Sequence, residues 1–299
     1  MILLVGATGR LGGAIAQALL AQGRSLRILL RRDSHSATLA PQGLATPAEA
    51  LLAAGAEAAF GDLKDRASLD AACEGITTLI TTANAARRSG ADTFTTVDLE
   101  GTQALIGAAA AAEVEHFVYT SAVGSDPAST HPLFSAKGRC EEALRNSGLT
   151  YTILKPAMFM EVWLGAVIAA PLRLGRPVTL VGQGSTRVPF VSMADVAAYA
   201  VAAVDHPAAR NAEIWIGGPH SASFTEAVRA VGDTLGRRLP VCYVRAGEPV
   251  PLLPAAMAQL LAAVESGPDQ DIDMSRTAAA YGIPPTPLEA FAARFFGGR

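Results

Sequence analysis

A glycine-rich turn near the start of the chain constrains its fold more than any other stretch. An apolar run at residues 2–5 ends in the turn 6–12 (GATGRLG), and a segment rich in Ala and Leu follows at residues 14–21. That order predicts a strand, a turn and a helix, which is the context in which a dinucleotide-binding glycine motif is meaningful. The first glycine allows the tight turn, the second lets backbone approach a pyrophosphate, and the third lets the helix lie close to the strand. The N-terminus of the helix then offers backbone N–H groups and a partial positive charge to the phosphates.

Length and composition indicate a globular protein with a sizeable core. The 299 residues are enough for one large α/β domain, with or without a smaller appendage. Hydrophobic residues make up 50% of the chain and charged residues 17%, which argues against extended disorder. The net charge of −3 gives no basic footprint for nucleic acid, so we expect no nucleic-acid partner.

Membrane, secretion and metal functions find no support in the sequence. No apolar run reaches the roughly 18 residues of a membrane span, and the chain does not open with the basic region of a signal peptide. Its three cysteines, Cys73, Cys140 and Cys242, are odd in number and lack the paired spacing of a metal site. We therefore expect a cytoplasmic protein with reduced thiols, no metal and no membrane association.

Strand and helix signals alternate along the first half of the chain, as a doubly wound parallel sheet of the Rossmann type requires. Strands are expected at residues 2–5, 25–30, 56–60, 77–82, 115–121 and 150–155. Helices are expected between them at residues 14–21, 47–54, 68–73, 98–112 and 134–147. The rhythm breaks at residue 156, where prolines and glycines become frequent, and further helices are expected near 194–204, 223–235, 255–264 and 288–295. We therefore predict a dinucleotide-binding domain over 1–155 and a mixed substrate-binding region over 156–299, from which some elements return to the main domain.

The end of the second predicted strand discriminates between NAD and NADP. An acidic residue there would bind the ribose 2′-hydroxyl, whereas an arginine accommodates a 2′-phosphate. Arg31 and Arg32 occupy this position, and Asp33 comes only after them. Guanidinium groups bind phosphate bidentately and stack on adenine, and Arg10 in the glycine turn is a candidate third partner of the phosphate. NADP(H) is thus favoured over NAD(H), the alternative being that the two arginines merely end a strand in solvent.

The glycine turn resembles the GATGxxG motif of extended and atypical short-chain dehydrogenases/reductases. Three further segments narrow the resemblance to the NmrA-like branch: residues 114–122 (VEHFVYTSA), 149–161 (LTYTILKPAMFME) and 189–197 (PFVSMADVA). The resemblance covers residues 1–240 and weakens beyond them. Members of this branch include NAD(P)H:quinone reductases, azo- and triphenylmethane-dye reductases, isoflavone-reductase relatives, and redox-sensing regulators with little or no catalysis.

The resemblance and the strand ends together predict the cofactor contacts. In relatives the segment after the third strand touches adenine, which assigns Asp62 and Leu63; alternatively, Asp62 caps the next helix. Thr82 and Ala83 end the fourth strand, where small residues suit the nicotinamide-side ribose, and the segment with Pro156 and Phe159 is expected to fold over the nicotinamide. The full set of candidate cofactor residues is Gly6, Thr8, Gly9, Arg10, Leu11, Gly12, Arg31, Arg32, Asp62, Leu63, Thr82, Ala83, Lys137, Pro156 and Phe159.

The catalytic pair of the superfamily is broken in this chain. The resemblance implies a Tyr-x-x-x-Lys pair on the helix after the fifth strand, in which the lysine holds the nicotinamide ribose and the tyrosine acts as acid or base. The lysine is present as Lys137, but Leu133 stands where the tyrosine should be. The remaining catalytic candidates are Ser121 and Tyr119, which alternation places on one face of the fifth strand. A buried structural Tyr119 stays open as the alternative.

These features favour an NADP(H)-dependent reductase that transfers hydride to a small apolar acceptor such as a quinone, an enone or an aryl compound. Met158, Met160 and Trp163, together with Phe159, either line the site of a flat acceptor or belong to the core. Two alternatives remain: a non-catalytic NADP(H)-binding redox sensor of the NmrA type, and an isoflavone-reductase-like enzyme with Lys137 as base. His131 is either a proton donor or an incidental loop residue, and the chain is either a monomer or a homodimer.

Overall fold

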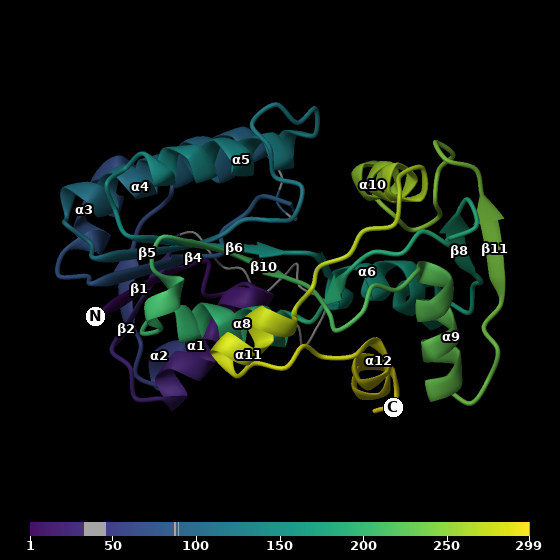
Figure 1. Cartoon of the computed structure of the whole chain (residues 1–299). Helices are drawn as coiled ribbons and strands as arrows, with labels where there is room; N and C mark the ends of the chain where they lie inside the picture. The colour runs from purple at the N-terminus through teal and green to yellow at the C-terminus, as the bar shows by residue number, and fades with distance from the viewer. Residues whose placement is uncertain (33–45, 87, 89, 299) are drawn as a thin grey trace. The chain divides into compact units, whose positions relative to one another are not determined.

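The computed structural model describes residues 1–32, 46–86, 88 and 90–298 (Figure 1). The chain forms two compact units, one made of Met1–Lys155 with Val196–Ile214 and the other of Pro156–Asp195 with Trp215–Arg299. The chain first leaves the first unit between Lys155 and Pro156, where the predicted rhythm breaks, and a later segment returns to it. Asp33, named above in the cofactor argument, lies outside the described residues.

The first unit is built on a seven-stranded sheet with the order β10-β6-β5-β4-β1-β2-β3. Its strands are β1 (Ile2–Val5), β2 (Leu26–Leu30), β3 (Glu57–Phe60), β4 (Thr78–Thr81), β5 (His116–Thr120), β6 (Tyr151–Pro156) and β10 (Ala212–Ile216). β1 pairs in parallel with β2 on one side and with β4 on the other, so that Leu4 lies opposite both Ile28 and Ile80. The predicted doubly wound α/β fold is confirmed, with six strands where they were expected and β10 as an addition.

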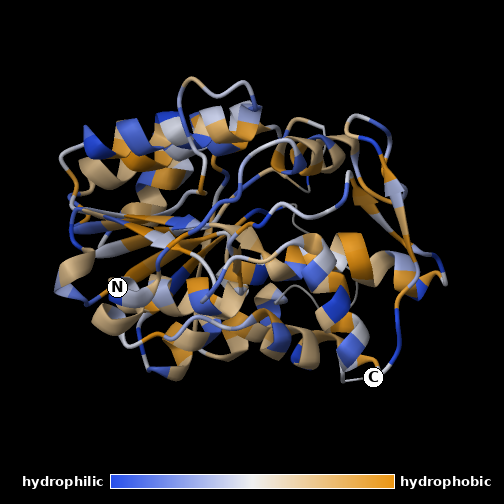
Figure 2. Cartoon of the chain, turned by 45° about the vertical axis from the view of Figure 1, so that its right-hand side comes forward, coloured by the Kyte–Doolittle hydropathy of each residue, from blue (hydrophilic) through white to orange (hydrophobic). Residues whose placement is uncertain are grey.

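Helices cover both faces of this sheet (Figure 1). One face carries α3 (Arg66–Cys73), α4 (Thr102–Ala111) and α5 (Pro132–Arg145), and the other carries α1 (Arg10–Ala21), α2 (Ala48–Ala53) and α8 (Met193–Ala203). The helix expected at 98–112 is two segments, because a π-helical stretch, η1 (Phe94–Gly101), precedes α4. Ala108 and Ala109 of α4 are fully buried, since their small side chains let this helix pack closely into the core. In Figure 2 the central strands are largely hydrophobic, whereas the helices carry hydrophilic residues as well.

The second unit combines two small parallel sheets with several helices. β7 (Met158–Phe159) pairs with β9 (Phe190–Val191), and β8 (Val178–Val181) pairs with β11 (Val241–Val244). Its helices are α6 (Met160–Leu164), η2 (Gly165–Ala169), α7 (Ala170–Arg173), α9 (Phe224–Thr234), α10 (Ala255–Glu265), α11 (Ser275–Tyr281) and α12 (Leu288–Phe296). Phe224, Val231 and Phe291 lie in its core. Within the described ranges no helix is both long and apolar enough to cross a membrane.

The stability of the first unit is expected to depend on pH through His116, at the start of β5. This side chain is fully buried, its Nε2 lies 2.8 Å from Thr152 Oγ1, and burial, aided by the nearby positive charge of Arg210, lowers its pKa from 6.5 to about 4. Between these two values the unfolded chain binds a proton that the folded protein does not, so the free energy of unfolding falls as the pH drops through this interval. The gap corresponds to roughly 3 kcal/mol. Urea denaturation from neutral pH down to about pH 4 should show this slope in the wild type and a shallower one in His116→Gln; equal slopes would contradict the prediction.

Candidate functional site

The glycine turn between β1 and α1 leaves no room for side chains at two of its positions. Gly6 has a φ of 91°, and a Cβ placed on it would lie 2.7 Å from Thr82 Oγ1. A Cβ on Gly12 would lie 2.1 Å from the carbonyl oxygen of Gly6. Gly9 is the N-cap of α1 and has no side chain with which to cap this helix end. The turn therefore brings Gly6, Gly12 and Thr82 together at a helix N-terminus, which is the arrangement that binds phosphate groups.

Replacing Gly12 with alanine is expected to destabilise the protein by about 3 kcal/mol, because the contact is with rigid backbone and overpacking of this kind costs roughly 1–3 kcal/mol or more. Gly165 is the matched control, since it is helical and a Cβ on it would meet nothing within 4 Å. Gly165→Ala should therefore be neutral or slightly stabilising. Denaturant unfolding of both variants checks this, and similar midpoints for both would show that α1 does not pack on the turn as described.

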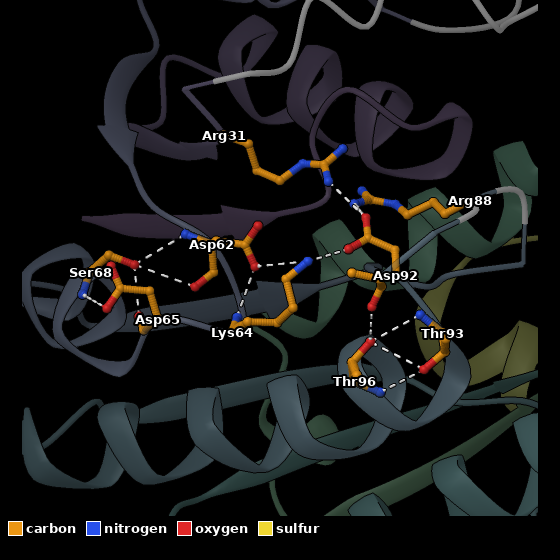
Figure 3. Close-up of polar contacts among 10 residues, drawn as sticks. Arg31, Asp62, Lys64, Asp65, Ser68, Arg88, Asp92, Thr93 and Thr96 are labelled. Atoms are coloured by element: carbon orange, nitrogen blue, oxygen red, sulfur yellow. Dashed lines mark hydrogen bonds and ion pairs between the residues drawn. The ribbon is translucent and has the colours of Figure 1, made fainter.

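The two arginines after β2 diverge. The Arg31 Nη1 atom lies 2.8 Å from Asp92 Oδ2, whereas the Arg32 guanidinium lies 5.5 Å from the centre of the exposed Phe60 ring. Asp92 also accepts bonds from Lys64 and, at 3.0 Å, from Arg88, so that three cations converge on one carboxylate (Figure 3). Sequence reasoning found Arg31 but missed the other members of this cluster.

The alternative that Asp62 caps the helix after β3 is wrong. The helix α3 has Asp65 as its N-cap, with its side chain accepting from the backbone of Ser68. The Asp62 carboxylate instead accepts from the backbone N–H of Lys64 at 2.9 Å, because an Asp side chain closes a turn two residues on. Leu63 is buried, and its side chain packs against Gly101. The Asp62 carboxylate therefore stands at the strand end, beside the cationic cluster.

Lys137 is buried at the carboxyl end of β5. Only 7% of the residue is exposed, its Nζ donates to the carbonyl oxygen of Thr120 at 2.8 Å, and it lies 5.3 Å from the centre of the Tyr119 ring. Burial lowers the pKa of Lys137, an effect opposed by the negative charge of Asp98. Leu133 lies one turn earlier on α5, in the half-buried first turn, where it offers no proton.

The Ser121 hydroxyl belongs to a buried network of charged and polar side chains. Its Oγ lies 2.5 Å from Glu141 Oε1, and Glu141 is 3% exposed. The other oxygen of Glu141 accepts from Lys155 Nζ and Arg145 Nη2, both at 2.9 Å. The Ser121 Oγ also lies 3.1 Å from Ser125 Oγ, so its hydroxyl has two protein partners. The catalytic role expected for Ser121 stays a prediction.

Neither Tyr119 nor His131 is well suited to donate a proton in this structure: the phenol of Tyr119 is a weaker acid than usual, and the imidazole of His131 is protonated less often than usual. Tyr119 is 2% exposed, and burial and the neighbouring Cys140 thiol raise its pKa well above 10. This favours the structural reading of Tyr119. His131 packs against Phe134 with ring centres 5.0 Å apart, its Nδ1 has no hydrogen-bond partner among the described residues, and burial lowers its pKa. Tyr119 and Ser121 both face α5, as alternation predicted.

The remaining candidates lie in the glycine turn, at the end of β4 and in the second unit. Thr8, Arg10 and Ala83 are half-buried, whereas Leu11 is in the core. In the second unit Pro156 is buried and Phe159 is half-buried, while Met160 is 1% exposed and Met158 and Trp163 pack against the same core. The core alternative therefore holds for Met160, and Trp163 meets Phe224 edge-on with ring centres 6.5 Å apart. In the described part of the chain, no His, Cys, Asp and Glu side chains gather in a group that could hold a metal.

Glu141 and Asp92 are the polar residues that sequence reasoning missed. Glu141 has a readable signal, because Lys137, Glu141 and Arg145 are spaced four apart and share one face of α5. Asp92 has none beyond its spacing of four from Arg88, since its other partners come from the ends of separate strands. Both carboxylates order cationic side chains at the edge of the sheet where doubly wound folds bind ligands.

Comparisons with known proteins agree with this geometry. The sequence profile of the NmrA-like family matches residues 1–292. Photosystem II assembly factor Ycf39 of Cyanophora paradoxa is 33% identical over 198 residues, a match that spans 66% of this chain and 57% of that protein. NAD(P)H azoreductase of Xenophilus azovorans is 29% identical over 245 residues, covering 82% of this chain and 76% of the azoreductase.

One solved structure has the same fold over nearly the whole chain. It is an NADPH-dependent quinone oxidoreductase from Escherichia coli, complexed with NADPH, with a TM-score of 0.75 and 23% identity. The superposition covers 99% of this chain and 100% of that one. At this identity the likeness concerns the fold alone.

Proposed function

The chain belongs to the NmrA-like family, and from this premise we propose that it is an NADP(H)-dependent oxidoreductase that transfers hydride to a small apolar acceptor, such as a quinone, an enone or an aryl compound. The observation that carries this proposal is Lys137, a buried lysine at the carboxyl end of β5, with Leu133 one turn earlier on the same helix. The azoreductase relative and the quinone oxidoreductase with the same fold support the reaction class.

The residues of the first unit fit a dinucleotide. Gly6 and Gly12 form a turn that a Cβ would fill, and the N-terminus of α1, capped by Gly9, lies where this type of fold binds a pyrophosphate. Arg31 follows β2, where it would meet a ribose 2′-phosphate. When bound, the nicotinamide cofactor would supply the hydride. The chain's own residues bind and orient it, with Lys137 holding the nicotinamide ribose.

The side chains that could donate a proton in this site indicate which class of hydride acceptor it would reduce. The Ser121 hydroxyl already contacts Glu141 and Ser125, the Tyr119 hydroxyl is buried with a raised pKa, and Leu133 has no proton to give. An acceptor that must be protonated as it accepts hydride is therefore expected to be reduced slowly. A quinone accepts hydride to give a hydroquinone anion, which then takes its proton from water. The Lys137 ammonium would stabilise the oxyanion that develops on such an acceptor.

Steady-state oxidation of NADPH with a panel of acceptors tests the proposal. We expect turnover with quinones and electron-poor aryl or azo compounds, and little with simple ketones, which require protonation of the alkoxide. Ketone reduction at a rate matching that of quinones would overturn the proton argument. Binding of NADPH without turnover on any acceptor would overturn the enzyme proposal.

Arg31→Ala is expected to weaken binding of NADPH by about tenfold or more, because a charge-assisted bond to phosphate contributes roughly 1.5–3 kcal/mol. Binding of NADH, which lacks that phosphate, should change little. Arg24→Ala is the matched control, because it also removes one positive charge from the protein. Arg24 forms its ion pair with Asp205, just after the end of α8. Isothermal titration calorimetry with both nucleotides checks this; equal losses for NADPH and NADH would remove the argument for NADP(H).

A non-catalytic role is the second candidate, favoured by the likeness to the assembly factor Ycf39 and by Leu133 in place of the tyrosine. Under this alternative the chain binds NADP(H) and reports the cofactor's redox state to a protein partner. The two proposals differ in one measurable respect, because a sensor distinguishes NADPH from NADP⁺ in binding but does not consume it. The cytoplasm, with its reduced thiols, is the compartment that we propose for either role, since all three cysteines are free.

A further inference from the structure

Three cationic side chains from separate parts of the first unit meet at the end of β2 and β3. Arg31 follows β2, Lys64 follows β3, and Arg88 belongs to the segment after β4. All three contact the carboxylate of Asp92, which comes from the same segment as Arg88 (Figure 3). The carboxyl ends of the neighbouring strands thus assemble a group that local sequence does not show.

The cluster carries an excess of positive charge that faces solvent. The side chains of Arg31, Lys64 and Arg88 are 37%, 35% and 33% exposed, whereas that of Asp92 is 10% exposed. The carboxylate therefore lies behind the cations. Asp62, whose Oδ1 is 3.8 Å from Lys64 Nζ, adds a second negative charge, so that these five side chains together carry one net positive charge. A dianionic group outside the cluster would meet three converging donors.

We propose that Lys64 and Arg88 complete, with Arg31, the subsite that recognises the 2′-phosphate of NADP(H), and that Asp92 is the residue that holds these three cations together. The inference rests on the proposed NADP(H) function and assigns its specificity to two residues beyond the arginine after β2. Arg31 fixes the location, because the strand end it follows is where a doubly wound fold places the adenosine ribose. A phosphate with two negative charges and several acceptor oxygens matches three cationic donors better than a carboxylate does.

Asp92 makes the cluster available before any ligand arrives. Burial alone raises the pKa of Asp92, but bonds from Lys64 and Arg88 and the charge of Arg31 hold it at about 2, so that the carboxylate is ionised at all physiological pH values. Three like charges would otherwise separate into solvent. With their rotamers already restricted, less side-chain entropy is lost when phosphate binds. A cluster that merely fastened the segment after β4 would stabilise the fold without distinguishing between nucleotides.

Calorimetric titration of Lys64→Met and Arg88→Met separates these two roles. Each variant should bind NADPH about tenfold more weakly than the wild type and NADH equally well. Arg66→Met is the matched control, because it removes the same charge at a position close to Lys64 in sequence. Arg66 forms its ion pair with Asp70 on α3 instead of with Asp92. Adenosine 2′,5′-bisphosphate and adenosine 5′-monophosphate are a second pair of probes, which differ only by the 2′-phosphate and contain no nicotinamide.

The proposal is supported if both variants lose affinity for NADPH and for the bisphosphate but not for NADH or the monophosphate, while Arg66→Met binds all four as the wild type does. Suppose that the wild type prefers NADPH, but that each variant loses affinity equally for NADPH and NADH, and for the bisphosphate and the monophosphate, or loses none. This result would overturn the proposed subsite and leave the proposed function in place. A wild type that binds neither nucleotide, or prefers NADH, would instead overturn the proposed function and this subsite with it. Thermal unfolding of the variants serves as the structural readout, since a mere fastening role would lower the melting temperature and leave the preference for NADPH unchanged.

Discussion

Lys137→Met is expected to lower the turnover of NADPH with a quinone by about 100-fold while leaving the protein at least as stable as the wild type. The loss follows from removing the ammonium that holds the nicotinamide ribose and supports oxyanion charge, effects of roughly this size in mutational studies. Stability is retained because Met has similar length, and because the burial of Lys137 works against its charged form. Steady-state kinetics and thermal unfolding of the same preparation measure both quantities.

The combination of results decides between a catalytic and a structural lysine. A structural Lys137, serving to satisfy the Thr120 carbonyl, would show reduced stability and nearly normal turnover in the Met variant. Arg139→Met, which removes an exposed cation from the same helix, should change neither quantity. Turnover of Lys137→Met within about twofold of the wild type, less than 0.5 kcal/mol in the barrier, would contradict the role assigned to the ammonium.

Glu141→Ala is expected to destabilise the protein by about 3–5 kcal/mol, the cost of removing one partner from a buried ion pair. Glu141 accepts from Ser121, Lys155 and Arg145, and Lys155 is 5% exposed. Without this carboxylate Lys155 keeps the longer ion pair with Glu213, whose Oε2 lies 3.6 Å from its Nζ. The free energy of unfolding from urea titration measures the loss.

The double variant Glu141→Leu with Lys155→Met tests whether the loss comes from an uncompensated charge. Buried ion pairs replaced by apolar residues of similar volume are often neutral in stability, so the double variant should recover most of what Glu141→Ala loses. The Ser121 hydroxyl would then lose its carboxylate acceptor, a cost of about 1 kcal/mol. A double variant no more stable than Glu141→Ala would show that packing around Glu141, rather than the charge of Lys155, sets its contribution.

The strands that alternate with helices were predictable because their signals are local. Short apolar runs are visible within a few residues of sequence at Ile2–Val5, before the glycine turn, and at β4 and β5. β10 was missed because the apolar run Ile214–Ile216 shows no polar/apolar alternation, although Trp215 is 45% exposed, and because its place in the sheet depends on pairing with a strand far away in sequence. The helical stretch from α6 to α7 was missed because Gly165 and Pro171 interrupt its pattern.

The candidate site was predictable where chemistry sits at a strand end and unpredictable where it depends on partners from other strands. The glycine turn, Arg31 and Lys137 follow from their positions relative to β1, β2 and β5. The direction of the Ser121 proton does not, since it depends on Glu141 one helix away. Likewise, Asp62 reads as a helix cap until Asp65 is seen to occupy that position.

Single-turnover mixing of NADPH-loaded protein with excess quinone follows hydride transfer itself. We expect the nicotinamide absorbance to disappear in proportion to the bound NADPH, and more slowly when the transferred hydrogen is deuterium. An NADPH-loaded protein whose absorbance stays constant with every acceptor in the panel would contradict hydride transfer, and would leave the chain as a binder of the cofactor.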